Sequence, residues 1–281
     1  MSMSSLTPFR EFYARLVTAS AEVRDERFRR AFASVAREQF LPPGPWKVLA
    51  SGGYIDTPAD DPALVYQDIV VAIDPVRRIN NGEPSLHARC LNAVSPQAGE
   101  SVLHIGCGSG YYTALLAQLV GPSGSVTGID VVQEIAAMAS RNLDQHAHVS
   151  VECRSGSAAP LPLSDVIYVN AGATEPLQVW LDALRPGGRL IFPLTPGWDY
   201  GGMLLVMRGD DDCIFDAQFV SQAGFIPCVG AQDATTLPRL KAAFQRPDWL
   251  NVRSLHVKDG EPDSSCWLAG ETWWLSTATV H

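Results

Sequence analysis

The feature that most constrains this chain is the run Val102-Leu-His-Ile-Gly-Cys-Gly-Ser-Gly-Tyr-Tyr112, followed by Gly128-Ile-Asp130. An apolar run leads into three glycines spaced G-x-G-x-G, and a helical pattern follows them. Glycines at such a junction let the backbone pass close to a ligand, and the first N–H groups of the helix face the ligand's polar end. Asp130 lies 20 residues after Gly110, where a carboxylate can accept hydrogen bonds from both ribose hydroxyls. The pattern therefore predicts a nucleoside cofactor site.

The position of the third glycine distinguishes between nucleoside cofactors. A nicotinamide or flavin site has the spacing G-x-G-x-x-G, which would put the last glycine at position 111. The chain has Tyr111 there and places its third glycine at Gly110. A pyrophosphate needs the wider spacing, whereas G-x-G-x-G suits the amino-acid tail of S-adenosylmethionine. We expect S-adenosylmethionine rather than a dinucleotide. The alternative is that the glycines form an ordinary strand-to-helix turn that binds no ligand.

Composition narrows the class of protein. With 281 residues, 46% apolar and 18% charged, the chain can bury a sizeable core. A net charge of −9 makes a nucleic-acid partner improbable, and no apolar stretch is long enough to cross a membrane. Met1–Ser5 has no secretory pattern, and the six cysteines lack C-x-x-C spacing, so we expect reduced thiols, a cytoplasmic location and no metal. The sequence leaves the oligomeric state undetermined.

Apolar periodicity indicates helices within 9–36 and over 86–94, separated by a loop-rich segment, and then a regular alternation of strands and helices. The predicted strands are 101–105, 125–129, 149–153, 165–169 and 189–192, and the helices between them are 112–120, 135–143 and 176–184. This alternation predicts an α/β fold with a parallel sheet covered on both faces. Met203–Met207 and Phe215–Val220 are too close together for a crossover, so we expect antiparallel edge strands. Trp267–Ser276 is predicted to be one further strand.

Several segments resemble protein-L-isoaspartate O-methyltransferases, in order and spacing, over about residues 20–230. The glycine motif Leu103–Ala117 resembles the family's cofactor motif, and Val35-Ala-Arg-Glu-Gln-Phe-Leu-Pro42 resembles its N-terminal "VpRe.Fvp" stretch. Leu184–Pro193 is similar to the entry of the family's fifth strand, and Gly224-Phe-Ile-Pro-Cys228 to its "FVPL" segment. The resemblance implies a doubly wound, mostly parallel, seven-stranded Rossmann-like methyltransferase sheet with an antiparallel edge strand. It also implies N-terminal helices and a substrate loop (1–95), a cofactor-binding core (96–231) and a C-terminal extension (232–281).

The chain departs from the family in the loop that binds cofactor and substrate. Asn80–Ala88 aligns with "TISaPhmhA": Pro84, His87 and Ala88 match, but the family's active-site serine falls on Gly82. His104 stands in place of a glutamate, and Ser155 replaces the acid of an adenine-contacting "GDG". We therefore expect a divergent member whose methyl acceptor differs.

The expected site is assigned from the motif together with the resemblance. Gly82 and His87 are the candidate catalytic residues, near the acceptor and the transferred methyl. The expected cofactor-binding residues are Gly106, Cys107, Gly108, Gly110, Asp130, Val131, Ser155, Gly156 and His87. Tyr66, Asp68 and Asn170 are further candidates for lining the acceptor pocket.

Methyl transfer from a sulfonium to a carboxylate needs positioning rather than a general base, because the carboxylate is already ionised at pH 7. We expect a carboxyl O-methyltransferase whose acceptor is a peptide, a protein or a small acid. Two alternatives stay open: a tRNA adenine methyltransferase, whose glycine motif is similar, and a non-catalytic adaptor that keeps the cofactor fold.

Overall fold

The computed structural model describes residues 3–280, and side chains from residue 6 onward. The chain forms two compact units: Met1–Gly99 with Cys107–Cys153, and Glu100–Gly106 with Arg154–His281. The boundary between them falls inside the glycine run, between Gly106 and Cys107. Residues 1 and 2 of the Met1–Ser5 segment interpreted above lie outside the described residues. The division at 95 and 231 stays a prediction.

The N-terminal part of the first unit consists of helices and short antiparallel hairpins. Its elements are α1 (Met3–Ser20), α2 (Glu26–Ser34), η1 (Arg37–Phe40), β1 (Lys47–Ala50), β2 (Gly53–Asp56), η2 (Pro62–Val65), β3 (Ala72–Asp74), β4 (Ile79–Asn80) and α3 (Pro84–Val94). The Asp25 carboxylate caps α2 by accepting a hydrogen bond from the Arg27 N–H at 2.9 Å. Phe28, Ala31 and Phe32 form the buried stripe of α2, as the periodicity predicts.

The remainder of the first unit alternates helix and strand. It contains α4 (Tyr111–Val120), β6 (Ser125–Asp130), α5 (Gln133–Asn142) and β7 (Val149–Cys153). The strands β6 and β7 are parallel, with Asp130 beside Cys153 at their carboxyl ends. Helix α5 packs against both strands and α4 packs against β6. The predicted βαβ arrangement is confirmed here.

The second unit is built on one sheet. Its elements are β5 (Ser101–Ile105), β8 (Ser164–Val169), α6 (Gln178–Asp182), β9 (Leu184–Leu194), β10 (Gly201–Met207), β11 (Ile214–Ala223), α7 (Thr236–Ala243), η3 (Pro247–Asn251), β12 (Ser254–Val257), β13 (Cys266–Ala269) and β14 (Trp273–Ser276). The strand order is β13-β14-β12-β11-β10-β9-β8-β5. The strands β5, β8 and β9 are parallel, and those from β9 to β13 pair antiparallel. The strands β5 and β8, and β9 from Leu190 onward, are largely apolar and buried, as strands covered on both faces are.

The predicted antiparallel pair is confirmed, but its place at the sheet edge is wrong. Strand β10 lies between β9 and β11, and β11 pairs on its other side with β12. The second unit alone therefore has eight strands in its sheet, one more than the seven expected. The physical reason is that an open edge exposes unpaired N–H and C=O groups, and the C-terminal strands cover those of β11.

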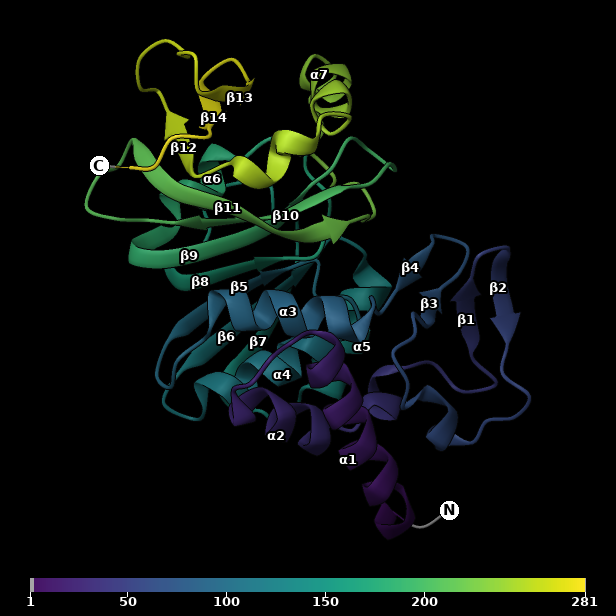
Figure 1. Cartoon of the computed structure of the whole chain (residues 1–281). Helices are drawn as coiled ribbons and strands as arrows, with labels where there is room; N and C mark the ends of the chain where they lie inside the picture. Colours follow the sequence, from purple (N-terminus) through teal and green to yellow (C-terminus); the bar gives the residue numbers. More distant parts are fainter. Residues whose placement is uncertain (1–2, 281) are drawn as a thin grey trace. The chain divides into compact units, whose positions relative to one another are not determined.

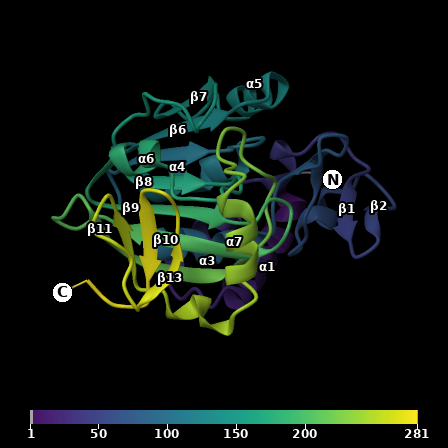
Figure 2. The ribbon, with the colours of Figure 1, turned by 90° about the horizontal axis from the view of Figure 1, so that it is seen from above.

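The segment predicted as one strand, Trp267–Ser276, is instead a hairpin of β13 and β14 (yellow in Figure 1). Gly270 begins its turn, and the Gly270 N–H donates to the Trp273 carbonyl oxygen at 2.8 Å. Figure 2 shows α7 beside β10 and β13, and α7 contacts β13. The C-terminal residues thus extend this sheet beyond β11 and place α7 against β13.

Candidate cofactor and acceptor site

Within the first unit, a tight glycine turn leads into α4. Gly110 is the N-cap of this helix and has φ +96°, a left-handed conformation that side chains disfavour. A Cβ atom at Gly110 would also lie 2.8 Å from Leu143 Cδ1. The Gly110 N–H donates to the Cys107 carbonyl oxygen at 3.0 Å, which closes the turn. The turn thus leads into a helix N-terminus, the part of a helix whose N–H groups can bind an anionic or carboxylate-bearing ligand.

Asp130 ends β6 and lies against this turn. Its Oδ2 accepts a hydrogen bond from the Gly108 N–H, and its Oδ1 accepts one from the Val132 N–H, both at 3.0 Å. A carboxylate offers about four lone-pair sites, so both oxygens retain acceptor capacity for hydroxyl groups. Burial raises the pKa of Asp130, and the hydrogen bonds from the backbone N–H groups of Val132, Gly108 and Val131 oppose that rise. The carboxylate is therefore fixed in orientation before any ligand arrives.

Val131, next to Asp130 in the chain, is exposed, whereas Cys107 and Ser109 of the glycine turn are buried. Val131 is 49% exposed, which is unusual for valine and leaves an apolar surface beside the carboxylate. Cys107 is buried, and this burial together with the Asp130 charge raises the pKa of its thiol, so it stays protonated at neutral pH. The Ser109 hydroxyl is buried and has no hydrogen-bond partner among the described residues.

In the second unit, Gly106 directly follows β5, and Ser155 and Gly156 come shortly after Cys153, the last residue of β7. A Cβ atom at Gly106 would lie 3.3 Å from the Asn170 backbone, and the Gly156 carbonyl oxygen accepts from Trp180 Nε1 at 2.8 Å. Ser155 Oγ lies 2.8 Å from Ser157 Oγ and accepts a hydrogen bond from the Ser157 N–H at 3.2 Å. Because Ser157 Oγ donates to the Val229 carbonyl oxygen, Ser155 donates to Ser157 and keeps one free lone pair.

The two candidate catalytic residues of the first unit touch each other. Gly82 follows β4, has φ +66°, and its N–H donates to Asn80 Oδ1 at 2.9 Å. His87 lies on α3, and its Nε2 is 2.1 Å from the position that a Cβ atom on Gly82 would occupy. The His87 ring is buried and stacks on Tyr112, with ring centroids 3.6 Å apart and an interplanar angle of 17°. The imidazole therefore occupies the space into which any side chain at position 82 would project.

A buried arginine that the sequence reading did not single out supports this loop. The Arg37 guanidinium is fully buried and donates to the carbonyl oxygens of Val65, Gln67 and Ile69 and to Asn81 Oδ1. The planar guanidinium of Arg37 thus holds the segment 65–69 and Asn81, the residue before Gly82, in place. No periodicity marks a buried arginine, and the only signal was its place in the "VpRe.Fvp"-like stretch.

The further acceptor candidates of the first unit are held in polar contacts. The Tyr66 hydroxyl donates to Glu38 and accepts from Arg10 Nε at 2.8 Å, and burial raises the Tyr66 pKa. Asp68 Oδ1 accepts from the Ser85 N–H at 2.8 Å, at the first turn of α3. Tyr66 is therefore committed to a structural network, whereas Asp68 keeps acceptor capacity beside the Gly82 loop.

Asn170, the last candidate, pairs with a buried histidine in the second unit. It follows β8, and its Nδ2 lies 2.8 Å from Nε2 of His104, a residue of the neighbouring strand β5. Burial lowers the pKa of His104 to about 3, so its ring is neutral and accepts the hydrogen bond from Asn170. The residue that replaces the family's glutamate is thus part of a neutral pair.

A glycine turn at the start of a helix, with a fixed carboxylate at the end of the following strand, defines a nucleoside-binding α/β protein of the Rossmann-like methyltransferase class. Solved structures agree on this fold. A protein-L-isoaspartate O-methyltransferase structure matches with a TM-score of 0.65 and 24% identity over 84% of this chain and 69% of its own. A putative enzyme of that name from Plasmodium falciparum, in complex with S-adenosyl-L-homocysteine, matches with a TM-score of 0.59 and 17% identity, over 78% and 97%.

Sequence comparison gives the family. The model of the protein-L-isoaspartate(D-aspartate) O-methyltransferase family matches residues 15–233. The protein-L-isoaspartate O-methyltransferase of Aeropyrum pernix is 30% identical, over 79% of this chain and 81% of its own length. The enzyme of the same name from Methanopyrus kandleri is 29% identical, over 75% and 86%. The chain belongs to this family of S-adenosylmethionine-dependent methyltransferases, which confirms the predicted family and the predicted cofactor.

Proposed function

We propose that the protein transfers a methyl group from S-adenosylmethionine to a carboxylate of an isoaspartyl-type residue in a peptide or protein. Family membership over residues 15–233 is the observation that carries this proposal. The cofactor supplies an activated methyl group, and the chain supplies binding, orientation and exclusion of water.

The residues present fit this cofactor. The Asp130 carboxylate, already oriented by two backbone N–H groups, would accept hydrogen bonds from the ribose hydroxyls. The exposed Val131 side chain beside it would pack under the adenine ring, and the free lone pair of Ser155 would accept from the adenine amino group. Gly106, Cys107, Gly108 and Gly110 would hold the amino-acid tail through the backbone, and Gly156 would leave room beside Ser155.

For the acceptor, we assign to His87 the hydrogen bond that the family's serine would make. The His87 ring fills the space at position 82, and its Nε2 is the ring atom nearest to the position that a serine Cβ would occupy. Gly82 allows the ring to approach closely because it has no side chain, and it contributes its own backbone groups to the site. Since the acceptor carboxylate is ionised at neutral pH, the site needs a donor to orient it rather than a base.

We also place the protein in the cytoplasm, on the strength of its six free cysteines. Among residues 3–280, no helix has both the length and the apolar character needed to cross a bilayer.

The proposal is tested by incubating the protein with methyl-labelled S-adenosylmethionine and an isoaspartyl peptide, with the aspartyl peptide of the same sequence as control. We expect base-labile label in the isoaspartyl peptide alone. Label in small acids but in neither peptide would move the acceptor to the small-molecule class. Binding of the cofactor without any base-labile ester would refute carboxyl methylation, and label in bulk tRNA would support the adenine methyltransferase alternative instead.

A further inference from the structure

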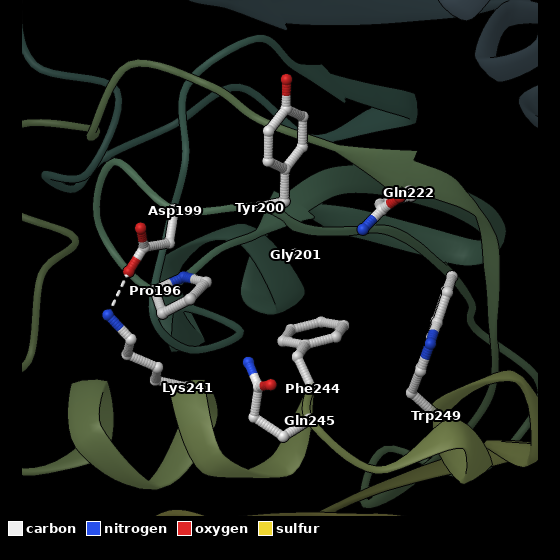
Figure 3. A pocket seen from close by; sticks show the side chains of 9 residues that line it. All are labelled: Pro196, Asp199, Tyr200, Gly201, Gln222, Lys241, Phe244, Gln245 and Trp249. Carbon is white, nitrogen blue, oxygen red and sulfur yellow. Dashed lines mark hydrogen bonds and ion pairs between the residues drawn. The ribbon is translucent and has the colours of Figure 1, made fainter.

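A pocket of about 260 Å³ lies in the second unit, and none of the site residues predicted from the sequence lines it (Figure 3). It is lined by the turn before β10, by one residue of β11, by α7 and by η3. The lining residues are Pro196, Asp199, Tyr200, Gly201, Gln222, Lys241, Phe244, Gln245 and Trp249. Its volume is smaller than the range of about 300–1,000 Å³ that is usual for sites of drug-sized ligands. The pocket has the size of one large side chain.

The apolar wall of this pocket is rigid. Phe244 and Trp249 meet edge to face, with ring centroids 5.8 Å apart. Both rings also pack against Phe219, at 5.5 and 5.2 Å, and Phe244 packs against Trp267 at 5.3 Å. Four interlocked aromatic rings hold their positions without a ligand, so an incoming side chain meets a preformed surface.

The polar groups of the pocket carry donors and acceptors but no net charge. The Asp199 carboxylate and the Lys241 ammonium are paired, with Nζ and Oδ2 2.6 Å apart. The side-chain amides of Gln222 and Gln245 point into the pocket in Figure 3, and within residues 3–280 neither takes part in a hydrogen bond. A carboxamide both donates and accepts, which matches a peptide group better than it matches an ion.

Two further observations point to a macromolecular ligand. Tyr200 on the rim is 71% exposed, and Trp198 on the same turn is 60% exposed. Neighbouring exposed aromatic side chains are typical of protein-binding surfaces. In addition, Lys241, Phe244, Gln245 and Trp249 lie beyond residue 233, where the match to the family model ends. One side of the pocket is therefore built from residues beyond the part of the chain that defines the family, and the other side from residues within it.

We propose that this pocket binds polypeptide: it accepts one large apolar side chain of an extended segment against Phe244 and Trp249. The main-chain groups of that segment form hydrogen bonds with the amides of Gln222 and Gln245. The identity of this polypeptide as the methyl acceptor rests on the proposed function, whereas its binding in the pocket does not. The pocket thereby selects protein substrates by a segment away from the methylated residue.

The binding step is tested first, by calorimetry with Gly/Ser-rich peptides that lack aspartate and carry one phenylalanine, one leucine or no apolar residue. We expect the phenylalanine and leucine peptides to bind and the third peptide not to bind. The double variant Gln222→Ala with Gln245→Ala should weaken binding about tenfold. Gln218→Ala is the matched control, because Gln218 is an exposed glutamine of the same strand β11 that does not line the pocket. Equal affinity of the three peptides, or unchanged affinity in the double variant, would overturn the proposal.

The substrate step is tested with two isoaspartyl peptides, one short and one extended on both sides by segments that contain leucine and phenylalanine. We expect a lower KM for the long peptide, and we expect the double variant to abolish this difference while leaving the short peptide unaffected. If the wild-type protein methylates neither peptide, the proposed function fails. The calorimetry then decides by itself whether the pocket binds polypeptide. If the long peptide has no advantage while the apolar peptides bind, the pocket serves a protein other than the substrate. The Trp249→Ala variant is not used, because the loss of its ring removes a contact with the ligand and also disturbs the packing of Phe219 and Phe244.

Discussion

His87 Nε2 lies 2.1 Å from the position that a Cβ atom on Gly82 would occupy. The His87 ring cannot retreat easily, because it is buried and stacked on Tyr112 at 3.6 Å. A histidine in this rotamer and a side chain at position 82 therefore exclude each other. The resemblance places both a serine and a histidine in this loop, so it is glycine at position 82 that allows the ring to lie this close to the backbone here.

The Gly82→Ser variant should consequently lose stability and activity, although it restores the residue typical of the family. Serine at φ +66° is strained, and its Cβ would overlap the ring, so we expect a loss of about 2–4 kcal/mol in the free energy of unfolding. Gly187→Ser is the matched control, because Gly187 has φ +74° and no atom within 4 Å of its Cβ position. Urea unfolding should show the larger loss at position 82 and a partial recovery in Gly82→Ser combined with His87→Ala. Equal losses at positions 82 and 187 would mean that the ring moves away freely.

The His87→Ala variant should lower kcat/KM for an isoaspartyl peptide about 100-fold, because it removes a donor to a charged acceptor. His87→Gln, which keeps an N–H donor on a side chain of similar reach, should recover most of that loss. Steady-state kinetics with both variants, together with their melting temperatures, separates the donor from the packing of the ring on Tyr112. Equal rates for the alanine and glutamine variants would exclude the hydrogen-bonding role.

Much of the fold follows from the sequence, because the relevant signals are local. Apolar periodicity predicts α2 and α4, and the buried runs predict β5, β6, β7 and β8 to within a residue or two. The C-terminal strands were harder to predict, since β12 to β14 are short and are stabilised by pairing with β11, a contact between distant residues. The prediction of one strand over Trp267–Ser276 was wrong, because the reversal is marked only by the short segment Gly270–Thr272 between two aromatic segments.

In the candidate site too, the features set by neighbouring residues could be predicted from the sequence, and the contacts between residues far apart in the chain could not. The glycine turn and Asp130 are legible from spacing, because both are fixed by one strand-to-helix unit. The sequence could not reveal that His87 fills the space beside Gly82, or that Arg37 holds the segment 65–69. Both are side-chain contacts whose geometry depends on tertiary packing. Nor did it reveal the aromatic pocket, whose four rings are brought together from β11, the end of α7, η3 and β13.

The Asp130→Asn variant should weaken the binding of S-adenosylhomocysteine about 30-fold or more. The amide removes the charge and turns one acceptor oxygen into a donor that faces the N–H of Gly108 or of Val132. Calorimetry measures the change, and Glu134→Gln serves as control, since Glu134 is an exposed carboxylate in the first turn of α5. Binding unchanged by Asp130→Asn would remove Asp130 from the cofactor site.

Protonation of His104 should destabilise the protein in mild acid. Burial holds its folded-state pKa at about 3, whereas an unfolded histidine has a pKa of about 6.5, so between these values the unfolded chain binds the extra proton. The neutral ring therefore contributes its full share of stability above pH 6.5, and that share falls by up to about 1.4 kcal/mol per pH unit below it. The His104→Gln variant keeps an acceptor for Asn170 but does not titrate, so its unfolding free energy should decline less steeply between pH 6.5 and 4.5. Urea unfolding of both proteins across this range measures the two slopes. If they are parallel, His104 is not the group that takes up the proton, and the acid sensitivity belongs to the carboxylates instead.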